Sequence, residues 1–215
     1  VCKGLNLIYF FLSFTGDSVM NATAYDTLFP PLPRRGLMHW AHQEMATADF
    51  GDQRLNQRAR VLLETLGEKP SLSIPAACGG GTETVAAYRF FNHENATFEQ
   101  VLQPHRQATV ERLGEHPVML LLQDTSELDY SSQPAIQGLG RTRTPKGYGA
   151  HLHPLLAVTP EGLCLGLVAA KLWSRTAEET LSPTKAKQRP LEEKESFRWL
   201  EMYRHACQLA GEVPQ

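Results

Sequence analysis

The chain has 215 residues, of which 42% are hydrophobic and 20% are charged, and its formal net charge is −2. These values are ordinary for a globular protein and are sufficient for one large domain or two small ones. The 4 cysteines are scattered and form no Cys-x-x-Cys pair, which argues against a zinc site of the usual spacing and against a disulfide scaffold. The near-neutral charge leaves nucleic acid open as a partner, because a basic face can lie within a neutral total.

Residues 1–37 are expected to lie outside the working fold, as a leader and linker. An apolar run between Leu5 and Phe14 loosely resembles a signal peptide, but it is too short to span a membrane and no small-residue cleavage site follows it. The prolines between residues 30 and 33 are typical of a linker. We therefore expect no membrane partner, and the scattered cysteines favour a reducing cytoplasm.

Residues 38–115 have the hydrophobic period of helices and are expected to form one helical domain. Asp52 is a good N-cap for a helix whose apolar residues recur every three or four positions. These apolar residues are Leu55, Ala59, Leu62, Leu63 and Leu66. Arg54 and Arg58 lie one turn apart and off this stripe, so both guanidinium groups are expected on one exposed face.

Three further helices are expected to follow, with Ser73, Thr82 and Thr97 at their N-terminal ends. The second of them carries Arg89, and the glycines at residues 79–81 separate it from the first. Short helices around a glycine-rich turn resemble a helix-turn-helix, which would place one helix in the major groove of DNA. A plain helical bundle is equally consistent with the composition.

The period changes after His116, where the five residues from Val118 to Leu122 are all apolar. A run of this kind predicts a strand that is buried on both faces of an α/β sheet. Asp124 follows it, at the expected carboxyl edge of the sheet, where polar site residues gather. An ionised carboxylate beside an apolar core requires a cation or hydrogen-bond donors, so Asp124 is the first candidate for chemistry. The alternative is that Asp124 only caps the turn that follows.

A loop rich in Gly and Pro at residues 133–149 carries Arg141, Arg143 and Lys146 beside Tyr148. Cations next to an aromatic side chain suit phosphate contacts and base stacking. A solvated surface loop explains the same residues equally well.

Two apolar runs, at residues 151–158 and 163–173, are joined by a turn containing Pro and Gly and predict a β-hairpin. Pro154 is expected at an edge or a bulge, because it cannot donate to a ladder. His151 and His153 alternate to one side of the first strand. Without a third ligand, they are expected to be surface or internally bonded residues rather than a metal site.

Residues 191–211 are expected to form the last helix, with a buried stripe of Phe197, Leu200, Tyr203 and Cys207 and with Glu192, Glu193 and Glu195 in its first turns. A buried strand, a hairpin and a helix in this order form the first half of an RNase H-like fold. The expected fold class is therefore mixed, α+β or α/β. An N-terminal helical domain is followed by residues 116–215 as an incomplete RNase H-like domain.

Four segments stand in a characteristic order and spacing along the chain. They are Phe50-Gly51-Asp52-Gln53-Arg54, Ala87-Tyr88-Arg89-Phe90-Phe91-Asn92, Gln123-Asp124-Thr125-Ser126-Glu127-Leu128-Asp129-Tyr130 and Glu193-Lys194-Glu195-Ser196. With these segments, the chain from about Met38 onward resembles the bacterial cut-and-paste DDE transposases of insertion sequences, especially the one that mobilises a kanamycin-resistance composite transposon.

The resemblance implies a role for each candidate residue. Asp124 matches the first carboxylate of the DDE triad and is the implied catalytic residue and metal ligand. The implied DNA-binding residues are Arg54, Arg58 and Arg89 in the domain that recognises the transposon ends, and Arg141, Arg143 and Lys146 in a variable basic loop near the active site. The second Asp, the final Glu and the C-terminal dimerisation helices of the family have no counterpart in this sequence.

The resemblance also implies phosphoryl transfer by two Mg²⁺ (or Mn²⁺) ions, one activating water or a DNA 3′-hydroxyl and the other stabilising the leaving oxygen. The implied partner is double-stranded DNA at transposon ends, the implied assembly of the full-length protein is a homodimer, and the implied location is the bacterial cytoplasm, in association with the nucleoid. With one of three carboxylates, this chain is expected to be the N-terminal part of a transposase and catalytically inactive by itself. The alternatives are a DNA-binding regulator or decoy derived from a transposase, a non-specific RNase H-like nuclease, and an α/β domain without a nucleic-acid role.

Overall fold

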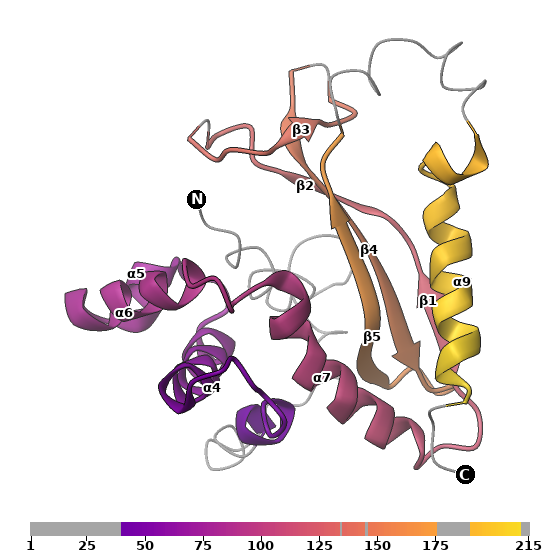
Figure 1. Ribbon diagram of the computed structural model, residues 1–215, viewed down its shortest axis with the longest axis horizontal. Coiled ribbons are helices and arrows are strands. Elements are labelled where there is room, and N and C mark those ends of the chain that lie inside the picture. The colour runs from indigo at the N-terminus through magenta and orange to yellow at the C-terminus, as the bar shows by residue number, and fades with distance from the viewer. Residues whose placement is uncertain (1–39, 134, 145, 176–189, 212–215) are drawn as a thin grey trace. The chain divides into compact units, whose positions relative to one another are not determined.

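The computed structural model describes residues 40–133, 135–144, 146–175 and 190–211, so the expected leader at residues 1–37 lies outside the described residues. The chain divides into two compact units, with the boundary between residues 108 and 109. The first unit consists of helices, and the second contains a five-stranded antiparallel sheet with a helix packed on it (Figure 1). The expected mixed helix-and-sheet class is thereby confirmed.

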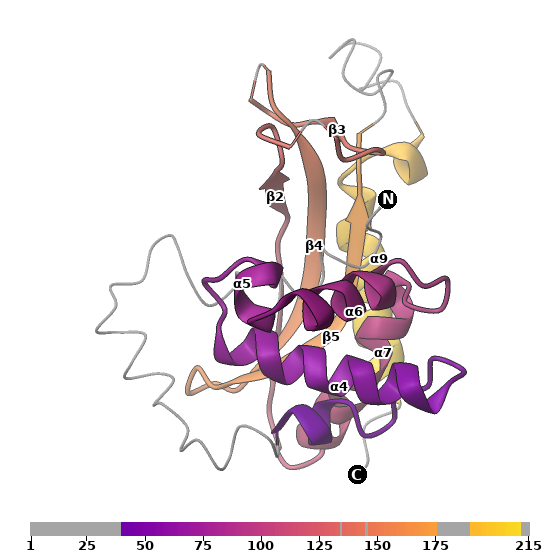
Figure 2. The same ribbon diagram turned by 90° about the vertical axis from the view of Figure 1, so that its left-hand side faces the viewer.

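The first unit contains α4 (Gln53–Glu68), α5 (Ile74–Cys78), α6 (Gly81–Phe91) and the beginning of α7 (Phe98–Leu113), which runs across the boundary (Figure 2). The predicted N-cap of α4 is confirmed, because the Asp52 side chain accepts a hydrogen bond of 2.6 Å from the Arg54 backbone N–H. The predicted apolar stripe of α4 is buried at Ala59, Leu62, Leu63 and Leu66. Sequence period and capping therefore placed this helix correctly.

The turn between α5 and α6 depends on glycine at one position. Gly79 ends α5 with φ +69°, a left-handed conformation that favours glycine. The start of α6 differs from the expectation, since its N-cap is Gly80 rather than Thr82 and no side chain caps it. The helix begins at Gly81, because Gly80 before it is extended (φ 176°, ψ 161°) and is the last residue outside the helical backbone.

An aromatic cluster forms the centre of the first unit. Phe50, Phe90 and Phe91 are almost fully buried. The Phe90 ring meets Phe50 edge-on at 5.3 Å and Phe91 at 5.6 Å between centroids. The Asn95 side-chain amide donates to the Phe50 carbonyl at 2.7 Å and ties the segment after α6 to the segment before α4. Burial of three large rings, each worth about 1.5–3 kcal/mol of transfer free energy, holds the short helices together.

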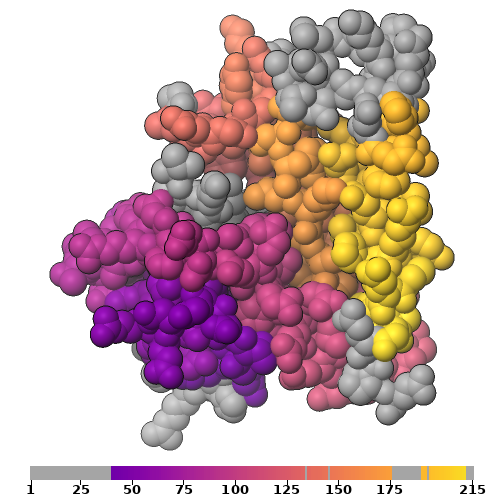
Figure 3. Space-filling model, in the orientation of Figure 1, coloured from indigo at the N-terminus to yellow at the C-terminus, as the bar shows by residue number. Residues whose placement is uncertain are grey.

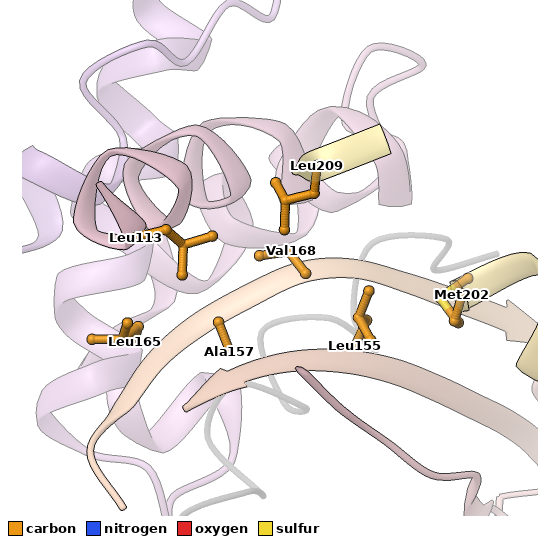
Figure 4. Packing of buried hydrophobic residues seen from close by; sticks show 7 residues of the cluster. All are labelled: Leu113, Leu155, Ala157, Leu165, Val168, Met202 and Leu209. Atoms are coloured by element: carbon orange, nitrogen blue, oxygen red, sulfur yellow. The ribbon is translucent and has the colours of Figure 1, made fainter. Parts of the chain in front are cut away.

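The second unit contains β1 (Leu120–Gln123), β2 (Ser126–Asp129), β3 (Gly140–Arg141), β4 (Tyr148–Val158), β5 (Cys164–Trp173), the 3₁₀ turn η2 (Leu191–Glu193) and α9 (Phe197–Leu209). The predicted hairpin is confirmed as β4 and β5, whose turn closes with a 2.9 Å hydrogen bond from the Thr159 N–H to the Leu163 carbonyl. The core of this unit lies between one face of the sheet and α9 (Figure 4). Its buried members are Leu113, Leu155, Ala157, Leu165, Val168, Met202 and Leu209.

The expectation that the strand before Asp124 is buried on both faces is wrong. Leu121 packs against the core that α9 covers, whereas Leu120 and Leu122 on the opposite face are 46% and 49% exposed. An uninterrupted apolar run does not reveal which of two faces a helix will cover, since alternate residues of a strand point to opposite sides.

The last helix also differs from the expectation. It begins at Phe197 rather than at residue 191, because residues 191–193 form a separate 3₁₀ turn. Its buried face carries Met202, Ala206 and Leu209, whereas Tyr203 is 60% exposed and Cys207 is exposed. Of the expected stripe, Phe197 and Leu200 are half-buried, so the prediction is wrong at Tyr203 and Cys207. Figure 3 shows α9 in yellow at the surface of the molecule.

Strands β1 and β2 are two halves of one line of pairing with β4. Gln123 lies opposite Leu155 and Ser126 lies opposite Leu152, so the register continues unchanged across the gap. Two residues, Asp124 and Thr125, fall outside the ladder at this gap.

The cause of the gap is Pro154. The Tyr130 N–H donates to the Tyr148 carbonyl at 2.8 Å, and in an antiparallel ladder every second pair is bonded in this way. Hydrogen-bonded pairs therefore recur at every second residue from Tyr130 and Tyr148. By this rule Asp124 and Pro154 would form a hydrogen-bonded pair. Pro154 has no N–H to donate, so the ladder fails there. Pro154 was expected at an edge or a bulge. It is not at an edge, since β4 pairs on both sides, but an irregularity in the pairing with β5 lies one residue away, between Leu155 and Leu156.

A test of the first unit concerns the cap of α7. The Gln100 N–H donates to the Thr97 hydroxyl at 3.2 Å, and the Gln100 side-chain oxygen accepts from the Thr97 N–H at 3.3 Å, as the predicted capping box requires. We expect Thr97→Ala to lower the free energy of unfolding by about 1 kcal/mol, measured by urea denaturation. Thr82→Ala is the matched control, because α6 has no side-chain cap, and an equal loss in the control would contradict the assignment.

Candidate nucleic-acid interface

Two of the predicted DNA-binding arginines lie one turn apart on α4. Arg54 is exposed. Arg58 is partly exposed and forms an ion pair of 2.5 Å with Glu83, in the first turn of α6. The pair joins α4 to α6 at a solvated surface, where such a contact contributes at most about 1 kcal/mol to stability. Glu83 therefore competes with any phosphate for the Arg58 guanidinium.

The exposed face of α6 carries the third predicted arginine. Thr82, Val85 and Arg89 are all exposed and recur at helical spacing, with Val85 at 49%. An exposed β-branched residue between a threonine and an arginine forms a surface with both apolar and polar contacts. Sequence reasoning selected Arg89 but missed Val85, although its position three and four residues from Thr82 and Arg89 was a usable signal.

The turn before α6 leaves room for close approach. A Cβ added at Gly79, Gly80 or Gly81 would meet no atom within 4 Å, so packing inside the protein does not require glycine at Gly80 or Gly81. Glycines without a structural cause are characteristic of places where a ligand approaches the backbone.

Asp124 is exposed and lies at the gap between β1 and β2. The expectation that it stands at the carboxyl edge of the sheet is wrong, because β2 continues along β4 beyond it. Its Oδ1 accepts a hydrogen bond of 2.7 Å from the Thr125 N–H. Among the described residues, its Oδ2 has no hydrogen-bond or ion-pair partner and is available to a cation.

His153 lies beneath this gap and is fully buried. Its Nδ1 is 2.6 Å from the Thr125 hydroxyl and its Nε2 is 3.1 Å from the Gln123 side-chain oxygen. Burial lowers the pKa of His153, and the nearby Asp124 charge opposes this shift. The expectation of an internally bonded histidine is confirmed at this position.

A second buried histidine, His151, belongs to a different cluster on the same face. It stacks on Trp173 at 5.4 Å between ring centroids, and its Nε2 is 3.3 Å from a Glu127 oxygen. Arg198 from α9 covers the Trp173 ring at 4.6 Å. Burial lowers the pKa of His151. Sequence reasoning treated His151 without its partners, since Trp173 and Arg198 come from elements that are distant in the sequence.

The carboxylates closest to Asp124 in sequence are engaged elsewhere. Glu127 accepts a hydrogen bond of 2.9 Å from the Arg143 N–H, and Asp129 accepts one of 2.8 Å from the Ser131 N–H. Within residues 40–133, 135–144, 146–175 and 190–211, no three His, Cys, Asp or Glu side chains gather as metal ligands would. A carboxylate oxygen such as that of Asp124 is the kind of hard ligand that Mg²⁺ prefers.

The basic loop is partly ordered by its own contacts. Arg141 in β3 lies over the ring of Tyr148 at 4.7 Å, and Tyr148 is 45% exposed. Arg143 and Lys146 are exposed. The loop therefore presents a stacked cation–aromatic pair with two further cations along the chain.

The family comparison concerns the first unit. Residues 37–96 match the family model described as transposase DNA-binding. This segment includes α4, α5 and α6, and with them Arg54, Arg58 and Arg89. The match supports a transposase with DNA as its partner, whereas Asp124 and the sheet lie outside the matched residues. No helix in the described part of the chain is long and apolar enough to cross a membrane.

A pH test follows from the buried histidines His151 and His153. Burial holds the pKa of His151 and of His153 below the ordinary value of about 6.5, so protons bind the unfolded chain more readily. We expect the free energy of unfolding to be unaffected by these groups well above about pH 6.5 and to fall as the pH drops through their folded pKa values. Urea denaturation between pH 5 and 8 measures this dependence.

His151→Phe should weaken this acid sensitivity, because it removes one of the two groups. His205→Gln, at an exposed position on α9, is the control and should retain the wild-type slope. An unchanged slope in His151→Phe would mean that His151 is not a source of the dependence.

Proposed function

We propose that the protein is a transposase chain that binds the terminal inverted repeats of a bacterial insertion sequence, of the kind that mobilises a kanamycin-resistance composite transposon. The observation that carries the proposal is the match of residues 37–96 to the transposase DNA-binding family, together with exposed arginines on two of its helices. Its DNA contacts combine phosphate binding with readout of base edges.

In this proposal α6 enters the major groove. Its exposed Thr82, Val85 and Arg89 offer a hydroxyl, methyl groups and a guanidinium, which suit thymine methyl groups and guanine edges. Arg54 and Arg58 on α4 bind flanking phosphates, with Arg58 exchanging Glu83 for DNA. The glycines at residues 79–81 permit close approach of the DNA backbone to the start of α6.

The second unit would contribute to metal-dependent strand cleavage and transfer. Asp124 would hold Mg²⁺ or Mn²⁺ through its available Oδ2, and two such ions supply activation of the attacking hydroxyl and stabilisation of the leaving oxygen. Its remaining carboxylate partners would come from outside the described residues, in an RNase H-like DDE site. Arg141, Arg143 and Lys146 would bind phosphates near the cleaved strand, with Tyr148 as a stacking surface. A homodimer would bring two transposon ends together.

A regulator or decoy is the second candidate function. It is favoured by one observation: among the described residues, no group of three His, Cys, Asp or Glu side chains is arranged to hold a metal ion. A protein with the end-binding unit but an incomplete metal site would occupy the ends and block an active transposase. Addition of the wild-type chain to a transposition reaction separates the two, since a decoy inhibits in proportion to its occupancy of the ends.

A binding test concerns the arginines. We expect Arg54→Ala and Arg89→Ala each to weaken binding of terminal-repeat DNA, and Arg54→Ala to reduce the slope of log affinity against log salt by about 1, as loss of one phosphate contact requires. Arg60→Ala is the matched control on α4, because the Arg60 Nε–H points to the Met45 carbonyl at 3.4 Å on another face. Gel-shift titrations at several salt concentrations measure the effect, and equal losses in all three variants would contradict the proposed face.

A catalytic test concerns Asp124. We expect Asp124→Asn to leave end binding within about twofold of wild type, because the residue lies outside the matched DNA-binding segment, and to abolish any Mn²⁺-dependent strand cleavage. Cleavage of labelled end DNA measures the activity. Loss of binding together with cleavage, or cleavage that survives the substitution, would contradict the role given to Asp124.

A further inference from the structure

We propose that His153 is a positioning residue for Asp124: its buried imidazole bonds the side chains on both sides of Asp124 and so fixes the direction of the carboxylate. The inference rests on the proposed role of Asp124 as a metal ligand. It adds a residue that touches neither metal nor DNA and acts only through Gln123 and Thr125.

The β-ladder cannot hold this segment. Pro154 lacks the N–H that would meet the Asp124 carbonyl, so the backbone at the gap loses a ladder hydrogen bond. Left without a substitute, a two-residue gap in a strand would sample several backbone conformations, and the carboxylate would move with them.

His153 supplies a substitute for the missing ladder bond. Side chains alternate along a strand, so Gln123 and Thr125 point to one face while Asp124 points to the other. His153 continues the same register opposite Thr125, on the face of Gln123 and Thr125. Its two ring nitrogens lie 2.6 Å from the Thr125 hydroxyl and 3.1 Å from the Gln123 side-chain oxygen. One ring therefore bridges the gap that its neighbour Pro154 creates.

Thr125 links His153 to the carboxylate. In this register the Thr125 N–H points away from β4 and cannot join the ladder. It donates to Asp124 Oδ1 at 2.7 Å instead. Because His153 holds Thr125 by its hydroxyl, it fixes the residue whose N–H binds one carboxylate oxygen of the exposed Asp124.

The ring itself is held by α9. Trp199 meets His153 edge-on at 5.1 Å between centroids, and the imidazole is fully buried. With Gln123 accepting at Nε2, the proton is on Nε2 and Nδ1 accepts from the Thr125 hydroxyl. Asn at position 153 can place an acceptor near Nδ1, whereas Phe fills the volume but offers neither bond.

The experiment compares His153→Phe with His153→Asn, and uses His151→Phe as the matched control. His151 is also buried, lies two residues away on the same strand face, and does not flank Asp124. Hydrogen exchange of the Thr125 amide, followed by NMR without metal, reports the Asp124–Thr125 bond. Broadening of the Asp124 and Thr125 amide NMR signals by Mn²⁺ reports the metal affinity of the carboxylate. Asp124→Asn is the control that lacks this carboxylate.

We expect His153→Phe to accelerate Thr125 exchange at least about fivefold, the effect of losing one hydrogen bond, and to raise the Mn²⁺ concentration needed for broadening. His153→Asn should stay close to wild type, and so should His151→Phe. Unchanged Thr125 exchange in His153→Phe, or an equal acceleration in His151→Phe, would overturn the proposal. If His153→Phe does not fold, Thr125→Val removes the same bond with little change of shape and must give the same acceleration.

Different results would contradict the metal role of Asp124 and the positioning role of His153. Wild-type broadening by Mn²⁺ that does not depend on Asp124 would refute the metal role, even if Thr125 exchange responded to His153 as expected. Asp124-dependent broadening with no response of either measurement to His153→Phe would refute the positioning role alone.

Discussion

The second unit depends on the absence of one backbone hydrogen-bond donor. Pro154 sits in the middle of β4, with neighbouring strands on both sides, where a proline is normally excluded. The missing N–H divides one line of pairing into β1 and β2 and releases Asp124 from the ladder. Burial of β4 against α9 and the unbroken register on either side of the gap offset the lost bond. An exposed carboxylate thereby lies in a two-residue gap with paired strand on either side.

The first unit also exposes polar side chains on a packed framework, but its framework consists of helices. Its helices are too short to be stable alone, and a cluster of three buried phenylalanines together with side-chain caps fixes them. The surface that remains carries arginines on α4 and α6 beside a turn in which Gly80 and Gly81 have no packing reason to be glycine. The DNA-binding family match falls on this unit, so binding and the proposed chemistry reside in separate compact parts of the chain.

Local signals in the sequence predicted local structure well. Asp52 and Thr97 were identifiable as caps because their bonds involve residues two or three positions away, and the β4–β5 hairpin followed from its turn. The predictions that were wrong concern features set by tertiary packing. These features are the exposure of Leu120, the buried face of α9 and the central position of Pro154. The bond of His153 to Thr125 spans 28 residues, so only the pairing of β4 with β1 and β2 reveals it. The assignment of Asp124 came from resemblance, and its place at a strand gap came from the fold.

The most direct test of the account is the position of a metal ion in a crystal of the protein with terminal-repeat DNA and Mn²⁺. The anomalous difference map should contain a peak about 2.0–2.2 Å from Asp124 Oδ2, the separation typical of a small divalent cation and a carboxylate oxygen. A map with bound DNA but no peak at Asp124, or with the metal held by other side chains, would contradict the central claim.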